Sequence, residues 1–301
     1  MRVSSNLVPN MLADLQQTQS QLNVALQEVS TGKDVSVPSD NPGASADMVA
    51  NTIETGQVDK YTQNVSGILS MVQTADSSLG TVVNSLTQAV SLGTQGSNGT
   101  TNSSNQQALA NQVQSILSTV VAQANSSYQG AYLFGGTATT TAPYTADSSS
   151  STGYTYNGNN NTNSVAVGDQ NSVQVNLPGD QIFSNSSNSV IGSLSSLVSA
   201  LQSGNTSQIE SATTSVNSAL NYVSTQRVFY GNAETQLNSQ DTYLQQETVN
   251  LSSQQTSLVG ISEAQAATDL SSAETANSAA MAAAAKVLPN TLLNYLSTPT
   301  S

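Results

Sequence analysis

A seven-residue repeat of apolar side chains in the C-terminal third is the feature that most constrains this chain. The repeat predicts one long helix packed along a partner, because apolar residues spaced in this way form one continuous face. About 50 residues of helix would span roughly 75 Å, which suits a rod better than an ordinary globular domain. The eight positions are Ile209, Val216, Val223, Tyr230, Leu237, Leu244, Leu251 and Leu258.

A second apolar run, between residues 58 and 89, supplies the partner helix. Its members follow one helical template with spacings of three and four: Val58, Tyr61, Val65, Ile68, Val72, Ala75, Leu79, Val82, Leu86 and Ala89. Helical spacing resumes between residues 109 and 128, where Gly130 would end the helix, and again between residues 190 and 201. Each aliphatic side chain buried between the runs contributes about 1.5–3 kcal/mol, so we expect this bundle to fold alone.

Composition changes between residues 136 and 189, which are rich in serine, threonine, asparagine and glycine. Short runs with a period of two occur at residues 154–156, 165–167 and 173–177, and they predict short strands joined by Asn/Gly turns. Few apolar residues accompany them. We therefore expect a small β-rich domain with a thin core, and a disordered loop is the alternative.

The two ends of the chain carry apolar helical stripes that need cover. The N-terminal stripe consists of Val8, Leu12, Leu15, Leu22, Leu26 and Val29, with Gln19 as a polar gap. The C-terminal stripe consists of Leu270, Ala273, Ala280, Ala284 and Val287, interrupted by Asn277, beside a second stripe of Met281, Ala284, Leu288, Leu292 and Tyr295. The ends therefore pack against each other or against copies of themselves. We expect an interface that orders on assembly, and the alternative is an intramolecular pair tucked against the body.

A proline-bounded segment separates the first helix from the body of the chain. Pro38, Ser39, Asp40, Asn41 and Pro42 cannot continue a helix and are expected to form a folded hinge. Asp40 or Asn41 is placed to cap the next helix, with Pro42 at its first position.

These patterns together predict a mainly α fold, in which a long antiparallel helical rod carries a small β-rich insert in the middle of the chain. The expected boundaries are 1–41 for the terminal helix and hinge, 42–131 and 190–261 for the two halves of the rod, 132–189 for the insert, and 262–301 for the C-terminal helix.

Composition excludes several classes of function. The net charge is −13 with only five basic residues, whereas nucleic acids and anionic membrane surfaces attract basic proteins. Cysteine and histidine are absent, so thiol catalysis, imidazole acid–base chemistry and the usual metal sites are not available. The acidic residues are scattered without ligand spacing. Carboxylate chemistry stays open, and we expect no cofactor or metal.

Targeting signals give a mixed indication. The sequence shows no transmembrane segment and no secretory signal peptide, which taken alone indicates the cytoplasm. The polar, cysteine-free composition is typical of extracellular proteins. Export by a route that uses no cleaved signal would reconcile the two.

Four segments resemble the flagellar hook-associated protein 3 family, which is flagellin-like. They are STGKDVSVPSDNPGASADMVA at residues 30–50, GAYLFGGT at 130–137, NLPGDQIF at 176–183 and the C-terminal helix from EAQAATDL to NYL. The MRVSSN opening and residues 227–237 are similar too. The matches occur in order over nearly the whole chain. SDNP in place of SDDP and the low charge of the insert depart from the family pattern.

The resemblance implies a non-enzymatic subunit of the bacterial flagellum, exported without a cleaved signal and located outside the cell. It implies a hook–filament junction ring of about eleven copies. The partners it implies are the adjacent hook-associated junction protein, flagellin, and a cytosolic export chaperone on the C-terminal helix. In this arrangement the terminal helices form the inner tube and the insert forms the surface.

Two other functions stay open at this point. The nearer one is flagellin itself, but the AKDDAAGLA-type hinge expected of flagellin is absent and PSDNPGAS stands in its place. The farther one is a monomeric adhesin that presents a β tip on a helical stalk. Deletion of residues 262–301 would separate an assembling subunit from an adhesin. The subunit would no longer attach the filament, whereas an adhesin would still bind its target.

Overall fold

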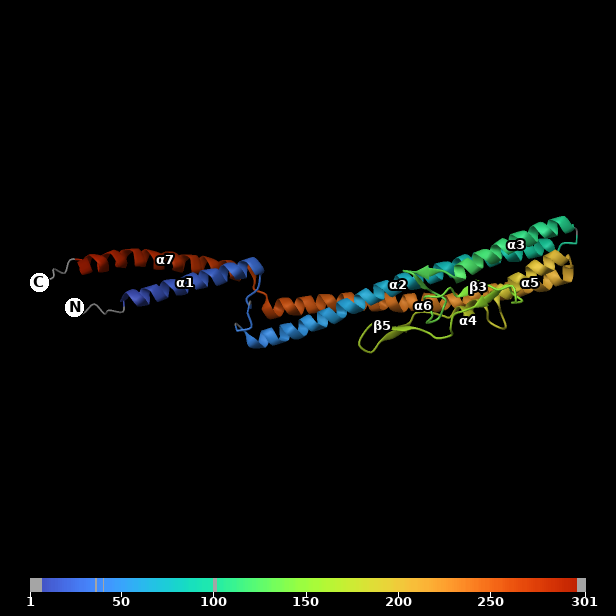
Figure 1. The fold of residues 1–301 in the computed structure, drawn as a ribbon. Helices are drawn as coiled ribbons and strands as arrows, with labels where there is room; N and C mark the ends of the chain where they lie inside the picture. Colours follow the sequence, from blue (N-terminus) through green and yellow to red (C-terminus); the bar gives the residue numbers. More distant parts are fainter. Residues whose placement is uncertain (1–6, 36, 40, 100–101, 297–301) are drawn as a thin grey trace. The chain divides into compact units, whose positions relative to one another are not determined.

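The computed structural model describes residues 7–35, 37–39, 41–99 and 102–296, with side chains described between residues 9 and 286. The predicted mainly α fold with a small β insert is confirmed (Figure 1). The helices are α1 (Leu7–Thr31), α2 (Pro42–Gly96), α3 (Ser103–Ala124), α4 (Gly179–Phe183), α5 (Val190–Ser203), α6 (Thr206–Val259) and α7 (Glu263–Leu296). The strands are β1 (Ser127–Tyr128), β2 (Ala131–Tyr132), β3 (Tyr144–Ala146), β4 (Tyr154–Tyr156), β5 (Ser164–Ala166) and β6 (Ser172–Gln174).

The chain divides into two compact units. The terminal unit consists of residues 1–57 and 247–301, and the central unit consists of residues 58–246. The long helices α2 and α6 contribute residues to both.

The two apolar runs that predicted the long helices form the helical core. Every member of the first run on α2 is buried except Tyr61, and every heptad position on α6 is buried except Leu258. Asp76 of α2 binds Arg227 of α6, while Gln73 binds Glu234, so the two helices run antiparallel. The predicted periodicity is therefore confirmed over both helices.

Helices α3 and α5 pack closely against each other in the central unit. Asn102 Oδ1 accepts a hydrogen bond from Asn105 N at 2.8 Å and caps α3. The expectation that this helix continues to Tyr128 and stops at Gly130 is wrong, because α3 ends at Ala124. Tyr128 lies in strand β1, and Gln129 and Gly130 take φ values of 50° and 82° to form the tight turn into β2.

The strands do not form one sheet. They pair as three separate antiparallel ribbons, β1–β2, β3–β4 and β5–β6. Two-stranded ribbons are marginal by themselves, so the insert depends on other elements for its core. The β-rich insert also contacts helix α6, through the rings of Phe134 and Tyr230.

An aromatic cluster makes this connection between the insert and α6. Phe134 lies at its centre, with its ring centroid 5.3 Å from that of Phe183 and 6.4 Å from that of Tyr230 on α6. Tyr144 packs edge-on against Phe183 at 6.0 Å. The Tyr230 hydroxyl also accepts a hydrogen bond from Leu177 N at 3.2 Å, so α6 holds the chain as it leaves the β6 ribbon.

Candidate assembly interface

Helix α7 presents a narrow seam of small residues to α1 in the terminal unit. The two helices approach closely, as alanine at the contact allows. The seam follows a heptad pattern: Ala266, Ala273, Asn277 and Ala284 are buried, and Leu270 and Ala280 between them are half-buried. All the members of the predicted first stripe whose side chains are described lie on this seam.

Helix α1 covers the seam with a face that only partly coincides with its predicted stripe. Leu15 and Leu22 are half-buried, and Ala25 is buried. Leu12 and Leu26, by contrast, are 59% and 47% exposed. A seam of alanines is narrower than the leucine stripe that faces it, so one edge of that stripe stays uncovered.

We name the uncovered side chains Leu12 and Leu26 of α1 and Met281 of α7 the outer apolar flank. Met281 is 51% exposed. Val29 is 46% exposed near the end of α1, but it projects on the same side of the helix as Met11 and not on this edge. At 3.6 residues per turn, Leu12 and Leu26 project from one side of α1 as it faces α7. Large apolar side chains exposed along a helix pair are candidates for contact with another protein.

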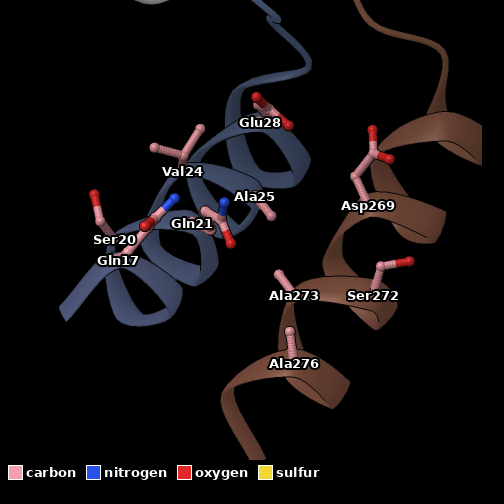
Figure 2. A pocket seen from close by; sticks show the side chains of 10 residues that line it. All are labelled: Gln17, Ser20, Gln21, Val24, Ala25, Glu28, Asp269, Ser272, Ala273 and Ala276. Atoms are coloured by element: carbon pink, nitrogen blue, oxygen red, sulfur yellow. The ribbon is translucent and has the colours of Figure 1, made fainter. Parts of the chain in front are cut away.

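A groove of about 620 Å³ lies along the same helix pair (Figure 2). Its lining residue Gln21 comes nine residues, or two and a half turns, after Leu12, so the groove lies on the side of α1 away from Leu12. Figure 2 shows Glu28 of α1 and Asp269 of α7 at one end, and Ala25 and Ala273 beside the space between the helices. The remaining lining residues are Gln17, Ser20, Val24, Ser272 and Ala276. The open, mixed lining lacks a set of converging catalytic groups, and it suits helix packing rather than chemistry.

Part of the predicted interface lies outside the side chains that the structure describes. These residues are Val8, Val287, Leu288, Leu292 and Tyr295. Their assignment to the interface stays a prediction.

The segment predicted to be a hinge ends where helix α2 begins. Asn41 Oδ1 accepts a hydrogen bond from Ala44 N at 3.0 Å, so Asn41 caps the helix and Pro42 is its first residue. Pro38 and Ser39 are exposed and lie in a turn. Asp40, the other predicted cap, lies outside the described residues.

Beside the predicted hinge, a short backbone bridge joins the segment after α1 to the segment before α7, and no sequence pattern predicted it. Asp34 N donates to Val259 O at 2.8 Å, and Ile261 N donates to Gly32 O at 3.1 Å. Gly32 takes a φ of 66°, which ends α1 and turns the chain into this bridge. The only sequence signal was a glycine at each side, Gly32 and Gly260.

One ion pair links α2 and α6 in the central unit. Arg227 Nε and Nη2 bind the two oxygens of Asp76 at 2.9 and 2.7 Å. The hydrogen bonds to Asp76 raise the pKa of Arg227. Both side chains are about one-third exposed, so this pair is a structural contact on the helix surface.

Chemistry of other kinds finds little support in the described residues. No group of three or more acidic, histidine or cysteine side chains there is arranged to hold a metal ion. None of the helices in that part of the chain has the length and hydropathy of a membrane span.

Comparison with known proteins gives two consistent results. A family model described as the bacterial flagellin N-terminal helical region matches residues 3–139. Among solved structures, a protein assigned as a flagellar hook-associated protein from Vibrio parahaemolyticus superposes with a TM-score of 0.67 at 17% identity, over 73% of this chain and 99% of that one. The chain has a flagellin-like fold.

Two further structures agree with this flagellin-like fold. FlgL from Bacillus cereus matches with a TM-score of 0.57 at 24% identity, over 69% of this chain and 97% of its own. The flagellar junction protein FlgL from Legionella pneumophila matches with a TM-score of 0.60 at 15% identity, over 71% of this chain and 100% of its own. No curated protein matches the chain. The resemblance seen in the sequence motifs is therefore confirmed for the fold.

Proposed function

We propose that this chain is a structural subunit of the bacterial flagellum that joins hook to filament as part of a hook-associated junction ring. The outer apolar flank of the α1–α7 pair carries the proposal, because its exposed leucines and methionine need a partner surface. The flagellin-like fold, which this chain shares with a flagellar hook-associated protein and a flagellar junction protein, supports the choice of partner.

The proposed interface consists of the terminal stripes, and the segment from Pro38 to Pro42 acts as the hinge. Neighbouring copies would cover the outer apolar flank and the groove on the opposite side of the pair. Because the two surfaces lie on opposite sides of the helix pair, contacts between them would be heterologous, and such contacts close into a ring or continue as a helix. The resemblance to the hook-associated protein 3 family implies a ring of about eleven copies.

The proposed partners beyond sister copies are an adjacent hook-associated junction protein and flagellin. A cytosolic chaperone would hold α7 before export, and export would use no cleaved signal. The chain would act as a scaffold without enzyme activity, and its mature location would be the flagellum outside the cell.

A filament subunit is the second candidate, because the matched family model describes a region of flagellin. A strain that lacks this chain separates the two functions. Loss of a junction protein leaves intact hooks that shed unattached filament protein into the medium. Loss of a filament subunit removes that protein from the medium as well, and this result would contradict the junction assignment.

The interface itself is tested by placing charge on the outer apolar flank. Leu12→Glu combined with Leu26→Glu should leave the folded chain intact, since both side chains are exposed, and should abolish filament attachment. Tyr243→Glu is the matched control, because Tyr243 is 59% exposed on the central unit. Electron microscopy of complemented cells gives the readout. Normal filaments on cells that carry the double variant would reject the interface.

Limited proteolysis of the isolated chain tests whether the terminal helices are ordered before assembly. We expect protease to trim the chain up to about Pro42 and back to about Ile261, because the terminal helices have little to bury alone. Ends that resist protease as strongly as the central unit would contradict ordering on assembly.

A further inference from the structure

One polar side chain interrupts the alanine seam of α7. Asn277 is 7% exposed and occupies the heptad position between Ala273 and Ala280. Its Oδ1 is buried and has no hydrogen-bond donor among the described residues. A buried acceptor that has lost its water and gained no donor destabilises the contact that buries it.

The covered face of α1 offers no donor to replace the lost water. Thr18 carries the one hydroxyl among its half-buried and buried side chains. That hydroxyl donates to Leu15 O of its own helix at 3.0 Å. Among the other half-buried or buried side chains of this face, Met11, Leu15, Leu22 and Ala25 are apolar, and Glu28 carries a carboxylate, which accepts hydrogen bonds and does not donate them.

The central unit shows that this chain can satisfy a buried asparagine. Asn176 is 5% exposed, its Oδ1 accepts from Asn163 N at 2.6 Å, and its Nδ2 donates to Gly136 O at 3.1 Å. A leucine or alanine in place of Asn277 would complete the seam and remove the unpaired oxygen. The asparagine therefore weakens the α1–α7 pair at its middle.

Closure of this pair also creates the surface that neighbours would bind. Leu12 and Leu26 come from α1, whereas Met281 comes from α7, so the outer apolar flank is complete only when the helices are paired. The groove on the opposite side likewise takes its lining from both helices (Figure 2). A pair that closed firmly in single copies would therefore expose both contact surfaces before assembly.

We propose that Asn277 keeps the α1–α7 pair weakly closed in single copies and thereby prevents self-association before assembly. The link to assembly rests on the proposed function, whereas the weak pairing of α1 and α7 is a property of the isolated chain. The relevant variant is Asn277→Leu, which keeps the branched shape of the side chain and removes the unpaired acceptor.

Hydrogen exchange on the isolated full-length chain tests the seam. Asn277→Leu should slow amide exchange in α1 and α7 about tenfold and leave α3 unchanged. Ser278→Leu is the matched control, since Ser278 is exposed one residue further along the same helix, and it should have little effect. Exchange in α1 and α7 that is unchanged or faster in Asn277→Leu would overturn the proposal.

Sedimentation of the same proteins tests the consequence. Asn277→Leu should self-associate at concentrations where the parent chain stays monomeric, and adding Leu12→Glu should restore the monomer without restoring fast exchange. Slower exchange with no self-association would overturn the link between the seam and assembly. Because neither measurement needs hooks or filaments, their outcome is independent of the test of the junction function in cells.

Discussion

The two units of this molecule differ in whether their buried polar side chains have hydrogen-bond partners. In the central unit, Asn176 is bonded at both ends of its amide, and Tyr144 donates to Gly179 O. In the terminal unit, Asn51 and Asn277 each leave a buried Oδ1 without a donor among the described residues. Ser126 Oγ is the exception in the central unit. An unpaired buried acceptor costs about 1–3 kcal/mol, so the terminal unit carries two such costs.

The central unit also buries larger apolar side chains than the α1–α7 seam of the terminal unit does. The central unit buries Phe134, Phe183 and Tyr230 completely or nearly so. The α1–α7 seam buries mostly alanine, which removes little apolar area from water. The comparison indicates a body that is stable alone and terminal helices that depend on added burial from neighbours.

The largest expected change in the free energy of unfolding comes from removing the centre of the aromatic cluster. Phe134→Ala should lower the free energy of unfolding of the central unit by about 3–5 kcal/mol, because Phe134 is fully buried. Met281→Ala, on a side chain that is 51% exposed, is the control and should change it by less than about 0.5 kcal/mol. Urea unfolding followed by circular dichroism measures both. Similar losses in the two variants would remove the distinction between the units.

Alkaline pH provides a second test, which acts on the central unit alone. Burial raises the pKa of both Tyr144 and Tyr230 above the usual value of 10. The folded chain therefore holds these protons more tightly than the unfolded chain, so stability is complete below pH 10 and falls as pH rises above it. The expected loss is about 1.4 kcal/mol per tyrosine for each pH unit above 10.

The pH dependence has its own controls. Tyr144→Phe should reduce the slope of unfolding free energy against pH by about 1.4 kcal/mol per pH unit in this range, which is the share of one buried tyrosine. Tyr243→Phe, on an exposed ring, should leave the slope unchanged. A flat profile between pH 10 and 11 in the parent chain would show that the two hydroxyls are not held in a buried environment.

The long helices could be predicted because many apolar positions repeat the same helical spacing. Ten positions on α2 follow one template, and eight on α6 follow another, so a single irregular residue such as Gly231 did not obscure them. Local capping chemistry was equally readable at Asn41, where neighbouring residues decide the conformation.

The parts that sequence reasoning missed depend on contacts between distant residues. The pattern predicted strands but gave no sign that Phe134 and Tyr230, far apart in the chain, share one cluster. Likewise, the leucine stripe of α1 was visible, but which edge stays exposed depends on the narrow seam of α7. The end of α3 was misplaced because Tyr128 continues the helical spacing, although Gln129 and Gly130 form a tight turn.

A smaller effect is expected at the ion pair between the two long helices. Arg227→Ala should lower the free energy of unfolding by about 1 kcal/mol, since both partners are partly exposed and salt screens the pair. The charge-swapped variant Asp76→Arg with Arg227→Asp should recover part of this loss. Thermal unfolding at low and high salt measures it. A loss that is equal at both salt concentrations would mean that packing of the arginine stem, rather than charge, supplies the stability.

Two substitutions of exposed side chains should have the smallest effect on stability, and they compare the assembly roles of the two units directly. Ile53 in the terminal unit and Val228 in the central unit are 59% and 57% exposed on long helices. Ile53→Gln and Val228→Gln should each change the unfolding free energy of the isolated chain by less than about 0.5 kcal/mol. If the terminal unit exposes apolar side chains for its neighbours, only Ile53→Gln should reduce incorporation into flagella, measured by competing tagged variant and parent chains in one strain. Equal incorporation of the two variants would confine the assembly surface to α1 and α7, whereas a defect in Val228→Gln alone would place it on the central unit and contradict the comparison.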